Sequence, residues 1–158
     1  MNDFYQNLNN RFRKYKKMIR ICNQSITYLF YILYPLLLIY ICLFEKNKLM
    51  KFILIPGVSF LLVSFFRKII KRKRPYEIYN FKPIIKKDSI QNSMPSRHVF
   101  SASIIAMCYL YFSMELGILL LIFALLSALL RVIGGVHFIS DVTVGYLFGI
   151  FCGLLLFV

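Results

Sequence analysis

A run of twenty residues from Ser25 to Phe44 contains no charged side chain. A segment of this length and composition is typical of a helix that crosses a bilayer, because about 20 apolar residues span the hydrocarbon core. The whole chain of 158 residues is 59% hydrophobic, with a mean hydropathy of +0.69. These values favour a single integral-membrane domain covering residues 1–158 over a soluble globular protein.

Four shorter apolar segments follow the first one along the chain. Each runs for about 15 to 17 residues, so we expect flanking basic side chains to extend to the headgroups and complete the span. The sequence therefore predicts an all-α fold, a polytopic membrane helix bundle of about five transmembrane helices. The four segments are Phe52–Phe66, Val99–Met114, Leu116–Leu130 and Val142–Val158. Within the last one, Gly145, Gly149 and Gly153 recur at steps of four, which predicts close packing against a neighbouring helix.

The first two dozen residues have a different pattern. Apolar residues recur at steps of three and four from Phe4 to Cys22, and six basic residues fill the other faces. This pattern predicts that residues 1–24 form a basic amphipathic helix lying on the membrane surface. The alternative interpretation is a solvated basic tail.

The net charge of +14 is concentrated at the ends of the apolar segments. This distribution points to membrane lipids with anionic headgroups as partners and argues against nucleic acid. If the spans alternate, the N-terminal helix, the loop 67–97 and the link 131–141 share one side, which carries most of the Lys and Arg residues. The positive-inside rule places that side in the cytoplasm, with the chain as a multi-pass protein of the cell membrane.

Three polar islands interrupt the apolar sequence, and they contain both histidines of the chain. They are the cationic stretch 67–75, the string Pro95-Ser96-Arg97-His98, and the link 131–141. Ionisable groups at membrane edges are costly to place, so they call by default for a functional explanation.

In the third island, His137 and Asp141 are four residues apart, which places them on one face if the last helix includes both. A carboxylate that accepts from one imidazole nitrogen leaves the other nitrogen free to attack a substrate. Arg131 offers a fork of donors to phosphate oxygens. The alternative is that Ser140 or Asp141 only caps the final helix.

In the second island, Ser96 is a candidate N-cap of a helix whose free N–H groups form an anion site. His98 is a candidate general acid, although a capped helix with an interfacial histidine explains the string equally well. In the first island, Arg67, Lys71 and Arg74 project from one side if the preceding helix continues to Pro75. The alternative for these cations is a membrane-surface anchor.

Together, the three islands resemble the type 2 phosphatidic acid phosphatase (PAP2) superfamily of membrane lipid phosphatases, which are related to vanadium haloperoxidases. The family motifs K-x6-R-P, P-S-G-H and S-R-x5-H-x3-D correspond here to Arg67-x6-Arg74-Pro75, Pro95-Ser96-Arg97-His98 and Leu130-Arg131-x5-His137-x3-Asp141. The resemblance implies a mechanism without metal or cofactor. In it, His137 attacks phosphorus to give a phosphohistidine, Asp141 orients it, and His98 protonates the leaving oxygen. The residues implied in phosphate binding are Arg67, Arg74, Ser96, Arg97 and Arg131.

Three positions depart from the family pattern. Arg67 replaces Lys and keeps the charge, and Leu130 replaces Ser and removes one hydroxyl donor. Arg97 replaces Gly, where the family relies on close approach of the backbone to phosphate. The Arg97 backbone N–H remains, and its side chain either adds a phosphate contact or reaches lipid headgroups.

The resulting prediction is a lipid phosphate phosphatase. Its candidate substrates are phosphatidic acid, phosphatidylglycerol phosphate and prenyl diphosphates such as undecaprenyl diphosphate. A metalloenzyme using His98, His137 and Asp141 is disfavoured, because the adjacent cations would repel a metal ion. A non-enzymatic basic protein that binds anionic lipid is the remaining alternative, and haloperoxidase activity is a distant one. The sequence indicates no particular oligomeric state.

Overall fold

A computed structural model describes residues 3–85 and 91–158, and all of its regular elements in these ranges are helices. This agrees with the predicted all-helical class. The elements are α1 (Asp3–Phe12), α2 (Lys16–Phe44), α3 (Leu49–Ile70), α4 (Pro75–Ile78), α5 (Arg97–Leu110), α6 (Met114–Ile133) and α7 (Ile139–Leu154), with short 3-10 turns at Arg13–Tyr15 and Lys46–Lys48.

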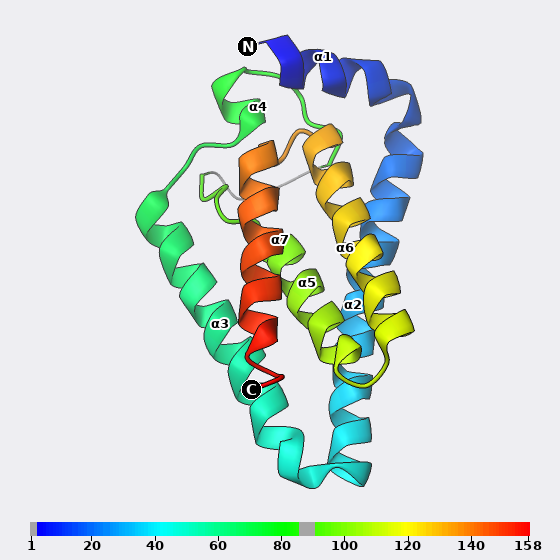
Figure 1. Cartoon of the computed structure of the whole chain (residues 1–158). Coiled ribbons are helices and arrows are strands. Elements are labelled where there is room, and N and C mark those ends of the chain that lie inside the picture. The colour runs from blue at the N-terminus through cyan, green and yellow to red at the C-terminus, as the bar shows by residue number, and fades with distance from the viewer. Residues whose placement is uncertain (1–2, 86–90) are drawn as a thin grey trace.

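Five apolar helices run up and down the molecule, while α1 lies across their upper end (Figure 1). Helices α2, α3 and α6 are long and apolar enough to cross a membrane, and α5 and α7 are shorter apolar helices. The predicted membrane bundle is thus confirmed, with five apolar helices in the positions expected from the sequence. The loop after α3, the α6–α7 link and α1 all lie at the same end.

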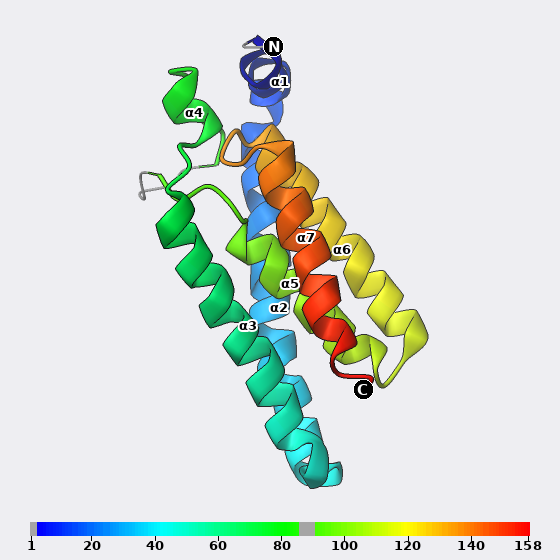
Figure 2. The ribbon, with the colours of Figure 1, turned by 60° about the vertical axis from the view of Figure 1, so that its left-hand side comes forward.

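Helix α5 lies between α3 and the α6–α7 pair (Figure 2). Nine of its fourteen residues are buried. A helix of this length is about 21 Å long, which is shorter than the hydrocarbon core of about 30 Å. Because its neighbours surround it, α5 does not need to match the bilayer thickness.

The predicted surface helix over residues 1–24 is divided in the structure. Helix α1 ends at Phe12, and residues 16–24 form the first turns of α2, which continues through the whole first apolar segment. No Gly or Pro interrupts α2 before Pro35, so the helix propagates across the predicted boundary. With 29 residues, α2 is about 44 Å long, so its basic start extends beyond the hydrocarbon core.

The second span does not continue through Lys71 and Arg74 to Pro75, so the condition under which Arg67, Lys71 and Arg74 share one helix side is not met. Helix α3 ends at Ile70, and Lys71 adopts a left-handed conformation with φ of 45°. Proline disfavours helical conformation in the residue before it, and Arg74 is extended, with ψ of 161°. Pro75 therefore begins α4 instead of ending α3, and in the stretch between the two helices Arg72 contacts the first turn of α7 while Arg74 contacts the α6–α7 link.

The glycine ridge of α7 packs against α5, as predicted. A Cβ atom at Gly145 would lie 2.7 Å from the backbone oxygen of Ser96, and one at Gly149 would lie 2.7 Å from Ser103 Cβ. Only glycine permits this approach of the two helices. The packing brings the start of α5 against the first turn of α7, where the Ser96 N–H donates to the backbone oxygen of Asp141 at 3.0 Å.

Candidate active site

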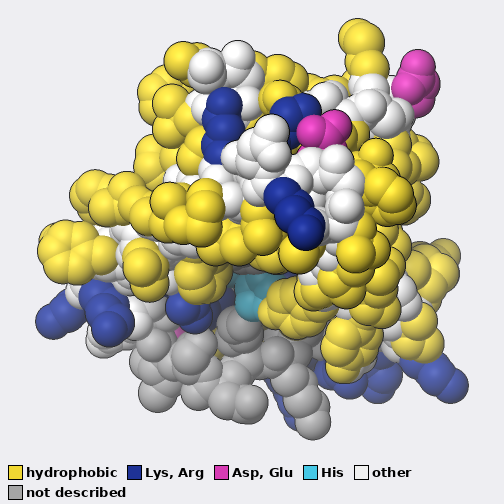
Figure 3. Space-filling model, turned by 90° about the horizontal axis from the view of Figure 1, so that it is seen from below, with side chains coloured by type: hydrophobic (Ala, Val, Ile, Leu, Met, Phe, Trp, Pro, Cys, Tyr) yellow, Lys and Arg dark blue, Asp and Glu magenta, His cyan; other side chains and the backbone are white. Residues whose placement is uncertain are grey.

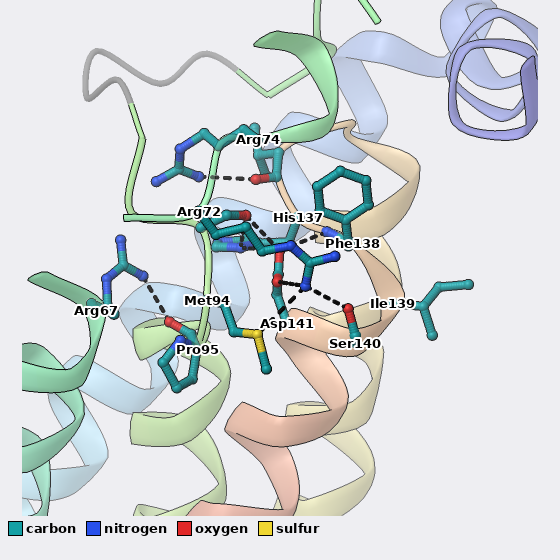
Figure 4. Close-up of polar contacts among 12 residues, drawn as sticks. Arg67, Arg72, Arg74, Met94, Pro95, His137, Phe138, Ile139, Ser140 and Asp141 are labelled. Atoms are coloured by element: carbon teal, nitrogen blue, oxygen red, sulfur yellow. Dashed lines mark hydrogen bonds and ion pairs between the residues drawn. The ribbon is translucent and has the colours of Figure 1, made fainter. Parts of the chain in front are cut away.

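The three polar islands meet at the upper end of the bundle (Figure 4). The last turn of α3 supplies Arg67, and Arg74 precedes α4. Ser96 stands at the start of α5, and Arg131 lies in the last turn of α6. His137 lies in the α6–α7 link, and Asp141 lies in the first turn of α7. All six of these residues are buried.

His137 and Asp141 lie together, as their spacing predicts, although α7 begins only at Ile139. The His137 Nδ1 atom is 3.6 Å from Asp141 Oδ2. The same oxygen accepts a hydrogen bond of 2.9 Å from the backbone N–H of Phe138. Asp141 therefore caps the helix and faces the imidazole at once, so the two interpretations of this carboxylate are not exclusive.

Two further side chains hold Asp141, and the sequence pattern did not single out either of them. Arg72 Nη1 donates to Asp141 Oδ1 at 2.8 Å and to Ser140 Oγ at 2.8 Å, and its guanidinium lies 4.4 Å from the centre of the Phe138 ring (Figure 4). Ser93 Oγ donates to Asp141 Oδ2 at 2.5 Å and is 3.3 Å from His137 Nδ1. Arg72 stands among other cations, and Ser93 lies outside the recognised motifs, so only the fold identifies them.

Burial lowers the pKa of His137 from 6.5 to about 4, and the hydrogen bond with Asp141 opposes this effect only in part. The imidazole is therefore neutral at neutral pH. With Nδ1 directed at the carboxylate and Ser93, the proton of the neutral ring belongs on Nδ1. The ring then presents the lone pair of Nε2 on the side away from Asp141.

Neutral groups hold the three buried guanidinium groups. Arg67 Nη1 donates to the backbone oxygen of Pro95 at 2.9 Å, and Arg74 Nη1 donates to that of Val136 at 2.9 Å. Arg131 Nη2 is 3.4 Å from Thr27 Oγ1. These carbonyl and hydroxyl oxygens orient the three guanidinium groups. Buried cations at one end of a bundle are suited to an anionic ligand.

Among the predicted phosphate-binding residues, some buried polar atoms have no hydrogen-bond partner within the described part of the chain. They include Ser96 Oγ and Arg131 Nε, and both are buried. A buried polar group without a hydrogen-bond partner lowers the free energy of unfolding by about 1–3 kcal/mol. Oxygens of a bound phosphate would accept from these groups, which agrees with the predicted anion site.

His98 lies in the wall of two adjoining cavities instead of in the buried cluster. One cavity, of about 470 Å³, also borders Arg131 and Arg20 on α2. The other, of about 210 Å³, also borders Arg97 and Phe60. Seen from below, the molecule has a hollow between hydrophobic side chains with a histidine inside it (Figure 3). Arg97 is exposed, and its guanidinium lies 5.8 Å from the centre of the Phe60 ring.

A metal site has little support in the geometry. Residues 3–85 and 91–158 contain no group of three or more His, Cys, Asp or Glu side chains that could hold a metal ion. Both oxygens of Asp141 accept hydrogen bonds from protein donors, one of them from Arg72.

Comparison with known proteins identifies the family of the chain. The model of the PAP2 superfamily matches residues 48–158. The crystal structure of LpxE from Aquifex aeolicus superimposes with a TM-score of 0.73 at 26% identity, covering 91% of this chain and 93% of that one. The crystal structure of the first transmembrane PAP2 type phosphatidylglycerolphosphate phosphatase from Bacillus subtilis gives a TM-score of 0.67 at 22% identity, covering 97% and 90%. No curated protein sequence matches the chain.

The fold and the match define a membrane-embedded phosphatase, a hydrolase of the lipid phosphatase class. The chain belongs to the PAP2 superfamily. The match begins at Lys48, so α1 and α2 lie outside it, although α2 contributes Arg20 and Thr27 to the surroundings of His98 and Arg131.

Proposed function

We propose that this protein hydrolyses a phosphate ester of a membrane lipid, with His137 as the nucleophile. The observation that carries the proposal is the neutral, buried His137 ring, whose Nδ1 faces a carboxylate held by Arg72, Ser93 and a backbone N–H. A fixed imidazole with one nitrogen engaged has the arrangement needed for nucleophilic catalysis.

In the first step, His137 Nε2 attacks phosphorus, and the bond from phosphorus to the lipid oxygen breaks. Asp141 stabilises the positive charge that develops on the ring. His98 gives a proton to the departing lipid alkoxide, which leaves as an alcohol. Its place in the cavity beside Arg131 supports this role, because the leaving oxygen must be reached from the side that holds the lipid.

In the second step, water attacks the phosphohistidine. His98, now neutral, takes a proton from that water, and the bond from phosphorus to Nε2 breaks. Inorganic phosphate leaves, and His137 returns to its neutral state. In both steps His137, His98 and water supply every proton and bond that the reaction needs, so neither step requires a metal or cofactor.

The negative charge of the transferred phosphoryl group is stabilised by Arg67, Arg74, Ser96 and Arg131. The buried donors Ser96 Oγ and Arg131 Nε, which have no hydrogen-bond partner among the described residues, support this assignment. We assign Arg97 a position at the mouth of the site, because its side chain is exposed and borders the same cavity as His98. Donors fixed before the reaction are the largest contribution to catalysis of this kind.

An apolar channel beside His98 supports a lipid substrate. The cavity that contains His98 and Arg97 shares Phe30, Tyr31 and Phe60 with a further cavity of about 370 Å³ between α2, α3 and α5. That cavity is lined almost entirely by apolar side chains, including Pro35 and Pro56. An acyl or prenyl chain lying there would place its phosphate at His98.

The substrate class follows from the membrane face. The cations of α1, of the start of α2 and of the loop after α3 gather at the end that holds the site, and by the positive-inside rule this favours a site on the cytoplasmic face of the cell membrane. A cytoplasmic site favours phosphatidic acid or phosphatidylglycerol phosphate. The second candidate is an undecaprenyl diphosphatase, which an outward-facing site would favour.

Phosphate release by the purified protein in EDTA, measured across these lipids beside a His137→Ala variant, tests the proposal. We expect metal-independent turnover of at least one lipid by the wild type and none by the variant. The non-enzymatic alternative predicts no turnover by either protein. Loss of turnover in EDTA would instead indicate a metalloenzyme.

A further inference from the structure

A second cavity with a basic lining lies at the junction of α1 and α2, next to the cavity that holds His98, with which it shares Arg20. Four basic side chains surround a cavity of about 400 Å³ there, and we name it the interfacial cation pocket. They come from the 3-10 turn after α1, from the first turns of α2 and from the loop after α4. The residues are Arg13, Lys16, Arg20 and Lys82.

The pocket is built by specific contacts across the chain. Arg13 Nη2 donates to the backbone oxygen of Lys82 at 2.8 Å, and Arg20 Nε donates to that of Ile84 at 2.6 Å. These bonds link residues 69 and 64 positions apart in sequence. Both acceptors are neutral carbonyls, and among the described residues neither guanidinium group has an ion pair or another hydrogen bond.

No described residue balances the charge in this pocket. Its lining contains no Asp or Glu, and no ion pair to any of the four cations occurs within the described ranges. Like charges gathered around one cavity repel each other, and an anion would relieve this. The volume falls in the range of ligand pockets, about 300–1,000 Å³.

The position of the pocket identifies its occupant. It lies at the start of α2, the end of this helix that joins α1 (Figure 1). Because α2 is longer than the hydrocarbon core is thick, we expect this basic end to lie among the headgroups of a bilayer. We propose that the interfacial cation pocket binds the phosphate group of an anionic phospholipid of the surrounding membrane. A bound headgroup would join α2 to the loop that carries Lys82.

The same loop contacts the link that carries His137. The backbone N–H groups of Ile84 and Ile85 both donate to the backbone oxygen of Gly134, at 3.0 and 3.3 Å. A lipid in the interfacial cation pocket therefore stabilises a segment that supports the candidate nucleophile, three residues from Gly134. Binding of this lipid is a separate event from hydrolysis of the substrate, so it can be tested by measuring lipid binding without measuring phosphatase activity.

The test is a titration of the full-length protein in detergent with short-chain phosphatidylglycerol, followed by native mass spectrometry. We expect saturable binding, and we expect a Lys16→Gln/Lys82→Gln variant to bind about ten to thirty times more weakly, since each basic residue near an anionic headgroup contributes to affinity. The matched control is Lys14→Gln/Lys17→Gln, which removes the same charge from another face of the same helical segment.

Three results would overturn the proposal. One is equal weakening by the two double variants, which would indicate unspecific surface attraction. Another is competition by inorganic phosphate at the same concentration as the lipid, which would assign the pocket to free phosphate. The third is equal loss of binding in a His98→Ala variant, which would place the lipid in the substrate cavity. Binding of phosphatidylcholine with the same chains is expected to be absent.

Discussion

Arg72 donates to Asp141 Oδ1 at 2.8 Å and so ties the loop after α3 to the first turn of α7. Asp141 presents its other oxygen to His137, 3.6 Å from Nδ1. Arg72 therefore reaches the proposed nucleophile only through the carboxylate, which makes it a positioning residue. The pair also joins two of the three sequence islands, which are about 70 residues apart in the chain.

We expect Arg72→Gln to lower kcat about tenfold with little change in KM. The variant removes a charge-assisted hydrogen bond that orients Asp141 without touching the substrate. Steady-state kinetics on a lipid phosphate measure the two constants. Lys73→Gln is the matched control, because it removes the neighbouring charge without affecting Asp141. A rise in KM at constant kcat would contradict the positioning role and indicate direct substrate binding.

The stability of the protein is expected to depend on the protonation of His137. Burial holds its pKa at about 4 in the folded protein, against an ordinary value of 6.5. Unfolding therefore takes up a proton between these pH values, and the free energy of unfolding falls as the pH drops from about 6.5 to about 4. Above pH 6.5 this loss is absent.

Thermal unfolding of the wild type and of His137→Gln in the same detergent measures this effect. The midpoint of the wild type should fall more between pH 7 and pH 4.5 than that of the variant, since glutamine does not titrate. Parallel curves for the two proteins would show that His137 is not buried in its neutral form.

Gly57 offers a test of the apolar channel. A Cβ atom added at Gly57 meets nothing within 4 Å, and the residue lines the cavity between α2, α3 and α5. We expect Gly57→Leu to fold normally and to raise KM severalfold for long-chain lipid phosphates, because leucine fills space that the chain would occupy. Turnover of a short-chain substrate should change little. Val58→Leu, on the exposed surface of the same helix, is the control.

Arg97 is expected to contribute to binding instead of to the chemical step. Its side chain is exposed and packs over Phe60 at the mouth of the cavity that holds His98. Arg97→Gln should raise KM about threefold to tenfold and leave kcat within a factor of about two, as expected for an interaction made equally in ground and transition states. A fall in kcat of about a hundredfold would instead show contact with the phosphoryl group.

The sequence was informative where the physical signal is local. Apolar length predicted the five helices of the bundle, and the step of four predicted the packing of Gly145 and Gly149 against α5. The motif spacing correctly brought His137 to Asp141. In each case the residues involved are close in the chain or follow a regular period.

The differences between the predictions and the structure have separate causes. The predicted end of the surface helix at residue 24 is wrong because no Gly or Pro stops α2 there, so the helix continues. The break after Phe12 coincides with contacts of α1 far along the chain, such as the hydrogen bond from Asn9 to Ile133. Arg72 and Ser93 contact Asp141 only because the loop after α3 returns over α7. No local pattern distinguishes Arg72 from the cations beside it.

The most direct test of the mechanism is the detection of phosphate on His137. Rapid quenching of a His98→Ala variant with a labelled nitrophenyl phosphate, whose leaving group needs no protonation, should trap an acid-labile, base-stable phosphoprotein, because only the attack by water then depends on His98. The label should map to His137 and should be absent from a His98→Ala/His137→Asn variant. Release of labelled phosphate with no protein-bound label at any quench time, or label that persists without His137, would contradict the account.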